Sequence, residues 1–291
     1  MSLPTPPLRS AWDRLSDPPR VSVVMTSFNY GRFVEEAIRS VAQQTRLPDE
    51  LLVVDDGSSD DSVARIHALL PTLPFATRFE ATPNRGQAAA INLACSWATG
   101  GVVAFLDSDD LWAPTKLERM LSLMAGQPGA AVYQHNLADG RGGLKRPVVV
   151  SGDPQLHWEA LGFVNLATHA SLHDLFLPTS GLVLERSVLD RVLPVPEALI
   201  TCPDAYLTRC ALRFGPLVSS AEVLGTWRDH GGNAGRGDRF GRRRFWLPVI
   251  APAINAFHRR HGSPVRFGED RLAAWAGRLG FDAIKERRRR G

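Results

Sequence analysis

The chain has 291 residues, of which 44% are hydrophobic and 22% charged, with 25 glycines and 21 prolines. This composition is that of an ordinary globular protein, and it excludes a disordered, collagen-like or coiled-coil organisation. The formal net charge is only +4, from 34 Lys and Arg against 30 Asp and Glu. Such a balance excludes the strongly basic composition of nucleic-acid-binding proteins, and we expect no nucleic-acid partner.

The N-terminal part of the chain predicts strands that alternate with helices. Short apolar runs predict the strands, and apolar residues at helical spacing predict the helices between them. In chain order the predicted strands are 21–25, 51–54, 77–81 and 102–106, and the predicted helices begin at Arg32, after a cap at Ser58 or Ser59, and at Gln87. Strands that are apolar throughout are buried on both faces, which indicates an α/β fold with a parallel sheet covered by helices on both sides.

The pattern weakens after Trp112. We expect a helix over 114–124, a strand over 130–133, a glycine-rich hairpin or loop over 139–143, a helix over 204–214, and strands near 217–218 and 223–227. The tail predicts a last amphipathic helix with one apolar face, formed by Leu272, Trp275, Ala276, Leu279 and Ala283.

Cysteine usage and hydropathy suggest a cellular location. Cys95, Cys202 and Cys210 cannot all pair and lack zinc-ligand spacing, which indicates inert thiols in a reducing compartment. We see no apolar run of the ~18 residues that a membrane-spanning helix needs and no apolar signal-peptide centre at the start. We therefore expect a cytoplasmic protein. The basic segments 242–244 and 287–290 could contact anionic lipids at the inner face of the membrane, or could form a solvated tail.

Polar turns follow all four predicted strands. They contain Thr26 to Asn29, Asp55 to Asp60, Asn84 to Gly86, and Asp107 to Asp110. In open parallel sheets, ligands bind beyond the carboxyl ends of the strands. We therefore expect the four turns to meet at one rim that binds a ligand.

The last of these turns carries two carboxylates one residue apart, Asp107 and Asp109. If the chain turns between them, both can face one small volume, where carboxylate oxygens suit Mg²⁺ or Mn²⁺. The alternative is a solvated acidic turn before the next helix. The preceding apolar strand and the neighbouring polar turns favour a metal site, with Asp110 in a structural role.

Three segments of this half carry a specific pattern in their order and spacing. They read VSVVMTSFNYGRFVEEAIRSVAQQT, LLVVDDGSSDDS and PNRGQAAAINLACSWATGGVVAFLDSDDLW. With them, about residues 20–125 resemble the inverting glycosyltransferases of family 2, which have the GT-A nucleotide-sugar-binding fold. Beyond this range the resemblance thins to PTSGLVLERSVLDRV, CPDAYLTRCALRFG and GTWRDHGGN.

The resemblance implies a fold, a function and a division of the chain. It implies a mostly parallel Rossmann-like sheet with a helical C-terminal extension. The implied function is metal-dependent transfer of a sugar from a nucleoside diphosphate, UDP or dTDP, to a hydroxyl of a glycan, lipid-linked or small-molecule acceptor, with inversion. The implied parts are a flexible arm (1–20), a nucleotide-sugar-binding half (21–125), an acceptor-binding half (126–235) and a helical basic extension (236–291).

The resemblance also assigns the donor side of the site. Asp56 would accept the ring N–H of uracil or thymine, Asp107 would contact the ribose, and Asp109 would hold Mn²⁺ or Mg²⁺. The residues implied to bind the nucleotide are Thr26, Asn29, Asp56, Arg85 and Asp107. The alternatives are a helix cap for the Asp55–Asp56 pair, a role that suits Asp60 better, and a plain exposed side chain for Arg85.

The acceptor side of the site is implied by shorter matches. The family places its catalytic base in an acidic motif, usually Glu-Asp, at a helix start. The matching stretch here reads Cys202-Pro203-Asp204, so Asp204 is the implied base, and the first turn of a helix is the structural alternative. His230 matches a histidine that returns to the metal or diphosphate, with a structural histidine as the alternative.

Three further residues complete the candidate site. Ser180 and Gly181 resemble a small-residue loop that packs against donor and acceptor, where glycine permits a close backbone approach. Trp112 is the tryptophan that we expect beside a sugar, although packing is the default for any tryptophan.

Two other functions remain open. A sugar nucleotidyltransferase would need a glycine-rich loop after the first strand to hold a triphosphate, and TSFNYGR is not such a loop. A non-catalytic nucleotide-sugar-binding protein would be consistent with the missing Glu before Asp204.

Overall fold

The computed structural model describes residues 19–144, 176–233 and 246–263. The chain divides into two compact units, Met1–Arg236 and Gly237–Gly291. Nearly all of the predicted N-terminal arm and the whole predicted helix around 272–283 lie outside the described residues. Within the described ranges, no helix is both long enough and apolar enough to cross a membrane.

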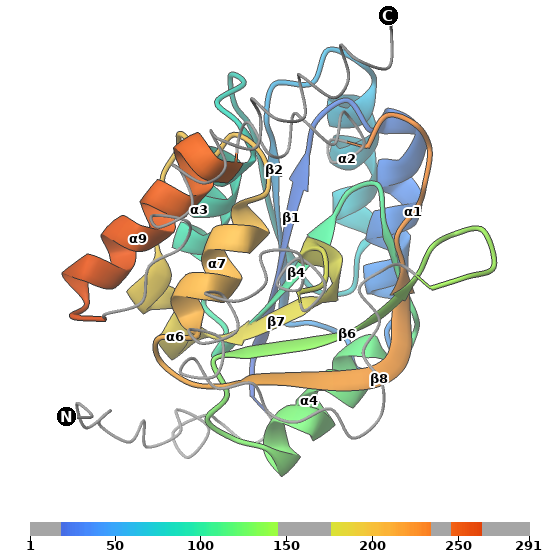
Figure 1. The fold of residues 1–291 in the computed structure, drawn as a ribbon. Helices are drawn as coiled ribbons and strands as arrows, with labels where there is room; N and C mark the ends of the chain where they lie inside the picture. The colour runs from blue at the N-terminus through green and yellow to red at the C-terminus, as the bar shows by residue number, and fades with distance from the viewer. Residues whose placement is uncertain (1–18, 145–175, 234–245, 264–291) are drawn as a thin grey trace, which may run out of the picture. The chain divides into compact units, whose positions relative to one another are not determined.

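The first unit contains a mixed sheet (Figure 1). The described strands pair in the order β3-β2-β1-β4-β7-β6-β8-β5. Their bounds are β1 Val21–Ser27, β2 Glu50–Asp55, β3 Ala76–Ala81, β4 Val102–Asp107, β5 Leu111–Trp112, β6 Val132–Ala138, β7 Leu182–Glu185 and β8 Leu217–Thr226. The first four strands are parallel, β7 runs antiparallel to β4 and β6, β8 is parallel to β6, and β5 is antiparallel to β8.

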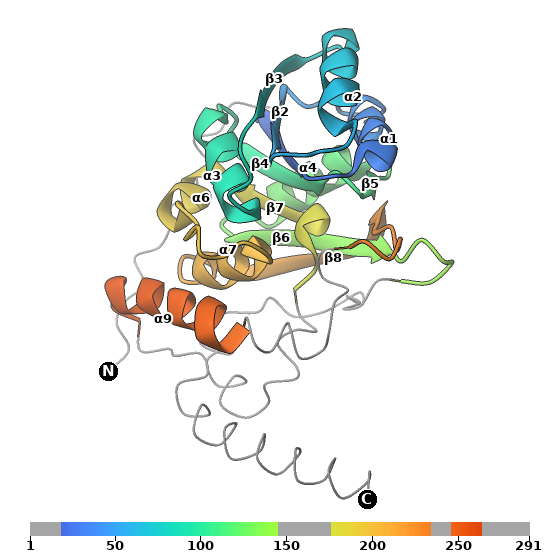
Figure 2. The same cartoon turned by 90° about the horizontal axis from the view of Figure 1, so that it is seen from above.

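Helices lie on both faces of this sheet, as predicted. Figure 2 shows α1 and α2 on one side and α3 on the other. The helices of the first unit are α1 Gly31–Ala42, α2 Ser62–Leu69, α3 Gln87–Trp97, α4 Lys116–Gly126, α6 Arg186–Val192 and α7 Pro203–Ala211, with 3₁₀ turns η2 Leu70–Thr72 and η3 Thr179–Gly181. The described part of the second unit contains the π-helical turn η4 Trp246–Ile250 and α9 Ala251–Arg260.

The alternation of side chains along β1 explains why both faces need a cover. Val23 and Met25 lie in one core cluster with Val34 and Ile38 of α1, while Val24 is also fully buried and points to the opposite face. Burial of one such side chain contributes ~1.5–3 kcal/mol relative to exposure. Strands β1, β2 and β4 are buried along nearly their whole length, as their apolar sequences predict. The edge strand β3 is largely exposed, because it has a neighbour on one side only.

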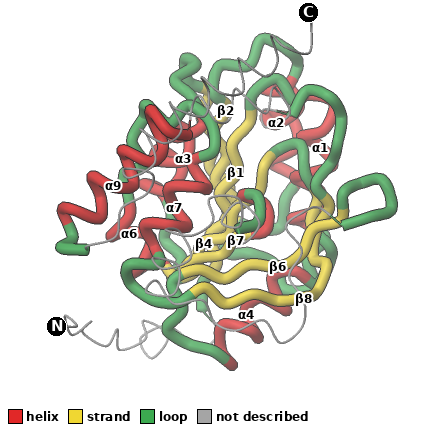
Figure 3. Tube along the Cα trace, in the orientation of Figure 1, coloured by secondary structure: helices red, strands yellow, loops and turns green. Residues whose placement is uncertain are grey.

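The C-terminal strands turn away from the first four. Figure 3 shows β6 and β8 running across the direction of β1 and β2, so that the sheet curls. The two strands predicted near 217–218 and 223–227 form the single strand β8, whose pairing with β6 shifts register twice between His135 and Ala138. The polar residues between the two apolar stretches of β8 lie in this irregular part of the pairing. They interrupt the apolar pattern, so the sequence suggested two strands.

One predicted helix cap was wrong. We expected Ser58 or Ser59 to begin α2, but the carboxylate of Asp60 accepts the backbone N–H of Ser62 at 3.0 Å and that of Gly31 at 2.9 Å. The hydroxyl of Ser58 instead donates to Asp55 at 2.6 Å. The alternative assignment of a capping role to Asp60 is confirmed, because its carboxylate binds free N–H groups at the starts of two helices.

Candidate active site

Strand register places the first site residues side by side. Thr26 on β1 lies opposite Asp107 on β4 and Val54 on β2. Parallel strands that are paired in register end at the same edge of the sheet, so the turns that follow them meet there. The rim predicted from the sequence therefore exists.

Asn29 joins the first two turns of this rim. Its side-chain oxygen accepts the N–H of Ser59 at 2.7 Å, and its own N–H donates to the Ser58 hydroxyl at 2.7 Å. Its backbone is left-handed, with φ of 57°, a conformation that asparagine tolerates better than most residues. Asn29 is thus fixed beside the second turn.

Asp56 joins the second turn to the third. Its two carboxylate oxygens accept the N–H groups of Arg85 at 2.7 Å and Gly86 at 2.9 Å. The two turns are in close contact, because a Cβ on Gly57 would lie 2.6 Å from the backbone nitrogen of Asn84. Asp56 therefore supports the loop before α3, and its contact with a pyrimidine stays a prediction.

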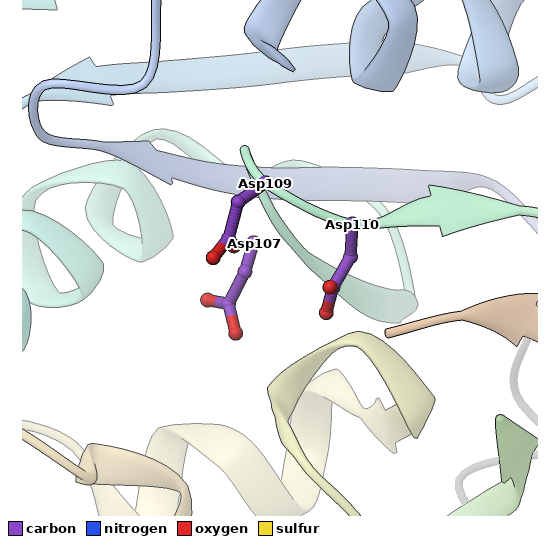
Figure 4. A group of neighbouring side chains, drawn as sticks. All are labelled: Asp107, Asp109 and Asp110. Carbon is purple, nitrogen blue, oxygen red and sulfur yellow. The ribbon is translucent and has the colours of Figure 1, made fainter. Parts of the chain in front are cut away.

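Three carboxylates converge in the turn after β4. Asp107, Asp109 and Asp110 project from this turn into one volume (Figure 4), and each offers an oxygen within 4.8 Å of the others. Burial, and then the charges of Asp109, Asp110 and Asp204, raise the pKa of Asp107 well above its ordinary value. Burial, and then Asp109, raise the pKa of Asp110 to about 7. A cation at this point would relieve the repulsion that raises these two pKa values.

The side chains of this cluster suit a divalent cation. Hard carboxylate oxygens at this spacing suit Mg²⁺ or Mn²⁺, and the imidazole of His230 suits the softer Mn²⁺ as well. His230 Nε2 lies 3.0 Å from Asp109 Oδ2, so that the two groups can face one ion. The donor set of this structure therefore agrees with the predicted cofactor.

Ser180 connects the acidic turn to β7. Its hydroxyl donates to Asp110 at 2.5 Å and accepts the N–H of Asp107 at 3.1 Å. Its carbonyl accepts the indole N–H of Trp112 at 3.0 Å and the ammonium of Lys116 at 2.9 Å. Ser180 is fully buried, and its hydrogen bonds hold the acidic turn in place.

Two sequence-predicted residues are packed inside the protein. Trp112 is 4% exposed, and the ammonium of Lys116 lies 3.5 Å from the centre of its ring. The packing alternative therefore describes Trp112. A Cβ on Gly181 would lie 3.1 Å from the carbonyl oxygen of His135, so the close approach that this glycine permits is to strand β6 of the protein itself.

Asp204 lies in the first turn of α7, next to the acidic cluster. Its charge is one of those that raise the pKa of Asp107, which places the two carboxylates within electrostatic reach. Burial raises the pKa of Asp204 itself, while the nearby guanidinium of Arg209 opposes this shift. A half-buried carboxylate with a raised pKa is suited to accept a proton.

Arg85 is held by an ion pair at the edge of the rim. Its guanidinium lies 2.6 Å from the carboxylate of Glu197, and both side chains are at least half exposed. The same loops also meet where the N–H of Gln87 donates to the carbonyl of Ile200 at 3.2 Å. The contact of Arg85 with a nucleotide stays a prediction.

Several contributing residues escaped the sequence reasoning. Gln87 donates to Asp107 at 2.9 Å, and Arg228 donates its backbone N–H to Asp110 at 3.0 Å. Asn233 donates to Asp109 at 3.2 Å. Arg228 and Asn233 lie in the same WRDHGGN motif as His230. The motif could have indicated all three residues, but only His230 was predicted from it.

Comparisons with known proteins agree with this geometry. Residues 22–193 match the family described as Glycosyl transferase family 2. An uncharacterized glycosyltransferase of Nostoc is 35% identical over 74% of this chain and 66% of its own length. A UDP-Glc:alpha-D-GlcNAc-diphosphoundecaprenol beta-1,3-glucosyltransferase of Escherichia coli is 40% identical over 36% of this chain and 40% of its own length.

Solved structures share the fold at low sequence identity. Staphylococcus aureus TarS in complex with UDP-GlcNAc has a TM-score of 0.64 and 18% identity, over 82% of this chain and 66% of that chain. A mannosyltransferase of Pyrobaculum calidifontis in complex with GDP-Man and Mn²⁺ has a TM-score of 0.57 and 18% identity, over 90% of this chain and 81% of that chain.

This chain spans only part of the length of these relatives. The matches cover 66% of the Nostoc protein, 40% of the E. coli enzyme and 66% of the TarS chain. The family match covers more than half of this chain and includes the rim and the acidic turn. On this evidence the chain, with its GT-A-like α/β fold, belongs to glycosyl transferase family 2.

Proposed function

We propose that this protein transfers a sugar from a nucleoside diphosphate donor, UDP or dTDP, to a hydroxyl of a glycan, lipid-linked or small-molecule acceptor, with inversion at the sugar carbon. The observation that carries the proposal is the convergence of the acidic turn, His230 and Asp204 at the carboxyl end of the parallel strands. The names of relatives support it, since the E. coli enzyme uses UDP-Glc and a diphosphoundecaprenol acceptor.

The nucleotide half of the proposal uses the rim residues. Asp56 accepts two backbone N–H groups, and a carboxylate has about four acceptor positions, so it can still accept the imide N–H of a pyrimidine. Thr26, Asn29, Arg85 and Asp107 surround the remaining parts of the nucleotide. Phe28, which is 44% exposed in the first turn, adds an aromatic surface for a base.

The metal half of the proposal uses Asp109 and His230 as ligands. Mn²⁺ or Mg²⁺ bound there would offset the charge of the diphosphate leaving group. The protein side of this site is already assembled, because Ser180 fixes the turn and His230 faces Asp109. The choice between the two ions is part of the proposal.

Asp204 acts as the general base. The acceptor hydroxyl gives its proton to the Asp204 carboxylate while its oxygen forms a bond to the sugar carbon, and the bond from that carbon to the diphosphate breaks on the opposite face. Because the partly buried Asp204 has a raised pKa, it holds the abstracted proton more readily than an exposed aspartate.

Cellular context is part of the same proposal. The acceptor half (126–235) would hold the sugar-accepting molecule, and the basic extension (236–291) would approach the inner membrane face, where lipid-linked acceptors are found. A cytoplasmic location, with peripheral contact to the membrane, fits this arrangement.

A donor screen tests the proposal. The purified protein is incubated with UDP-glucose, UDP-N-acetylglucosamine, dTDP-glucose and GDP-mannose, with Mn²⁺, Mg²⁺ or a chelator, and release of the nucleoside diphosphate is measured. Release from a uridine or thymidine donor that stops with the chelator supports transfer. Binding of such donors without release with any acceptor would favour the non-catalytic binding protein.

Calorimetry with free nucleotides tests the base preference separately. UDP should bind more tightly than ADP, because an unpaired acceptor at Asp56 costs ~1–3 kcal/mol, which corresponds to a factor of about 5–150 in affinity. Equal affinities for the two nucleotides would contradict the role of Asp56.

A further inference from the structure

The segment that follows β8, residues 228–233, folds into a loop that closes on itself through one side chain. The amide nitrogen of Asn233 donates to the carbonyl of Arg228 at 2.8 Å, and its amide oxygen accepts the N–H of His230 at 3.1 Å. The same amide nitrogen donates to Asp109 Oδ2 at 3.2 Å. Asn233 is 7% exposed, so its amide is committed to the loop and to the acidic turn.

Arg228 attaches this loop to helix α1. Its guanidinium donates to the carbonyl of Phe33 at 3.0 Å, to the carboxylate of Glu36, and to the carbonyl of Asp109. It also lies 4.6 Å from the centre of the Phe33 ring. Because a guanidinium is a rigid planar fork with five donors, one side chain can hold three partners at fixed angles. Arg228 therefore ties α1, the loop and the backbone of the acidic turn together.

The imidazole of His230 is oriented by contacts at both ring nitrogens and with the ring of Phe33. Its Nε2 faces Asp109 Oδ2 at 3.0 Å, and its Nδ1 accepts the N–H of Gly232 at 3.3 Å. The ring packs 4.4 Å from the Phe33 ring, measured between centres. Since Nδ1 is an acceptor here, the neutral ring carries its proton on Nε2, which donates to Asp109. A cation bound at this nitrogen would replace the proton, while the ring keeps its orientation.

We propose that Arg228 and Asn233 are positioning residues that form a latch, which fixes the ring orientation of His230 and the carboxylate of Asp109 before donor and metal bind. The inference rests on the proposed function for its consequence, because a preset pair of ligands binds a cation more tightly than a mobile one. Loss of partners that orient metal ligands typically weakens metal binding by ~10–100-fold.

The first experiment measures the tautomer of the His230 ring in the metal-free protein, independently of any activity. Two-bond ¹H–¹⁵N correlation spectra report the tautomer of each histidine ring, and His230→Gln assigns the His230 signal by removing it. The wild-type ring should be a single Nε2–H tautomer. In Asn233→Ala the ring should show averaged nitrogen shifts, because Asn233 no longer holds the backbone of His230. An unchanged His230 signal would overturn the latch.

The second experiment reads its consequence. In Mn²⁺ and UDP titrations by calorimetry, Asn233→Ala should weaken Mn²⁺-dependent binding by ~10–100-fold, while thermal unfolding shows that the fold survives. Arg228→Lys should give a loss in the same direction, since lysine keeps the charge without the planar fork. The matched control is Asn136→Ala, which removes another buried amide, one that donates to the carbonyl of Ala221 at 2.9 Å.

The two readouts separate the latch from the proposed function. An equal loss of affinity in Asn233→Ala and in the Asn136→Ala control would overturn the inference, because the effect would then be a general loss of stability. If the wild-type protein shows no response to Mn²⁺, the proposed metal role fails, and the histidine signals alone decide whether the latch exists.

Discussion

Two regions of the first unit build the same site in different ways. In the region from β1 to β4, each site residue lies at or just after the end of its own strand, as Asp56 follows β2 and Asp109 follows β4. In the region from β6 to β8, Ser180 bonds to a residue 70 positions earlier and His230 to one 121 positions earlier. In the first region, the local strand–turn sequence positions each site residue. In the second region, contacts with residues far away in the sequence position them.

The difference has a physical origin in topology. Successive strand–helix units place every turn at the same edge of a parallel sheet, so the first region needs no further information to assemble its rim. The second region contains antiparallel and non-sequential pairs, with β7 between β4 and β6. We therefore expect mutations in the first region to remove groups that bind the nucleotide or the metal. Mutations in the second region should affect the catalytic base, or should affect the metal through His230 and the residues that orient its ring.

The sharpest test of this division is Asp204→Asn in the second region. The amide keeps the shape of the side chain but cannot accept the proton of the acceptor hydroxyl, so turnover should fall by ~10²–10⁴-fold. Donor affinity, measured by calorimetry with UDP, should stay nearly unchanged. A loss of donor affinity would make Asp204 a binding residue. Normal turnover would move the search for a base to Asp229, Glu185 and Asp174.

The pH dependence of turnover checks the same assignment. Because burial raises the pKa of Asp204, the ionised base should be lost on acidification at a higher pH than for an ordinary aspartate. The acidic limb of the kcat profile should therefore lie above the usual range of this residue type. A limb that is unchanged in an active Asp204→Asn protein would exclude Asp204 as its source.

The matching test in the first region is Asp109→Ala. Removal of this carboxylate should abolish Mn²⁺-dependent binding of UDP while the fold survives, because Asp109 lies on a rim and not in the apolar core. Calorimetry with and without Mn²⁺ measures the effect. Asp190→Ala is the control, since Asp190 is half exposed in an ion pair with Arg186 on α6. A mutant with an unchanged Mn²⁺ response would remove the metal assignment.

A smaller effect concerns stability in the presence of a chelator. The folded-state pKa of Asp110 is raised to about 7, first by burial and then by Asp109. A raised carboxyl pKa contributes stability that is present below the ordinary value near 3.8 and is lost as the pH rises through about 7. The free energy of unfolding should therefore fall as the pH rises through this window.

Denaturant unfolding at pH 5 and pH 8 measures this loss, and Asp110→Asn should reduce it. Addition of Mn²⁺ at pH 8 should restore stability, because the cation favours the ionised carboxylates. A mutant whose stability changes with pH as much as the wild type would show that other groups cause the dependence.

The contrast between the two regions also explains what the sequence could predict. The strands and helices of the first region, its rim and the acidic turn follow from apolar periodicity and from polar residues at strand ends. Strands β5 and β7 were not predicted, because β5 has only two residues and β7 only four. Such short strands have too little pattern of their own and form only because neighbouring strands already exist.

The same limit applies to individual site residues. Trp112 suggested a sugar contact by its position after the acidic turn, but its indole N–H is used by the carbonyl of Ser180. Arg228 and Asn233 are of residue types that are usually exposed, so nothing in their type suggested buried contacts with Asp109. Their role became visible when the fold brought residues 228–233 against the acidic turn.

The smallest effect we expect lies where the two regions meet, at Arg85 and Glu197. Their carboxylate–guanidinium contact of 2.6 Å is largely exposed, and exposed pairs contribute only ~0–1 kcal/mol to stability. If Arg85 binds the nucleotide, Arg85→Ala should raise the donor KM a few-fold, roughly the value of one charged contact at a solvated site. Glu197→Gln should leave KM unchanged or lower it, because it frees the guanidinium.

Steady-state kinetics of the two variants distinguish three roles for this pair. A KM that rises equally in both variants would mean that the ion pair holds the two loops together, as does the bond between Gln87 and Ile200. A KM that changes in neither would leave Arg85 as a plain exposed arginine. A KM that rises in Arg85→Ala and falls in Glu197→Gln is expected only if Arg85 leaves Glu197 to bind the donor. In that case the carboxylate of Glu197 and the nucleotide compete for the guanidinium of Arg85.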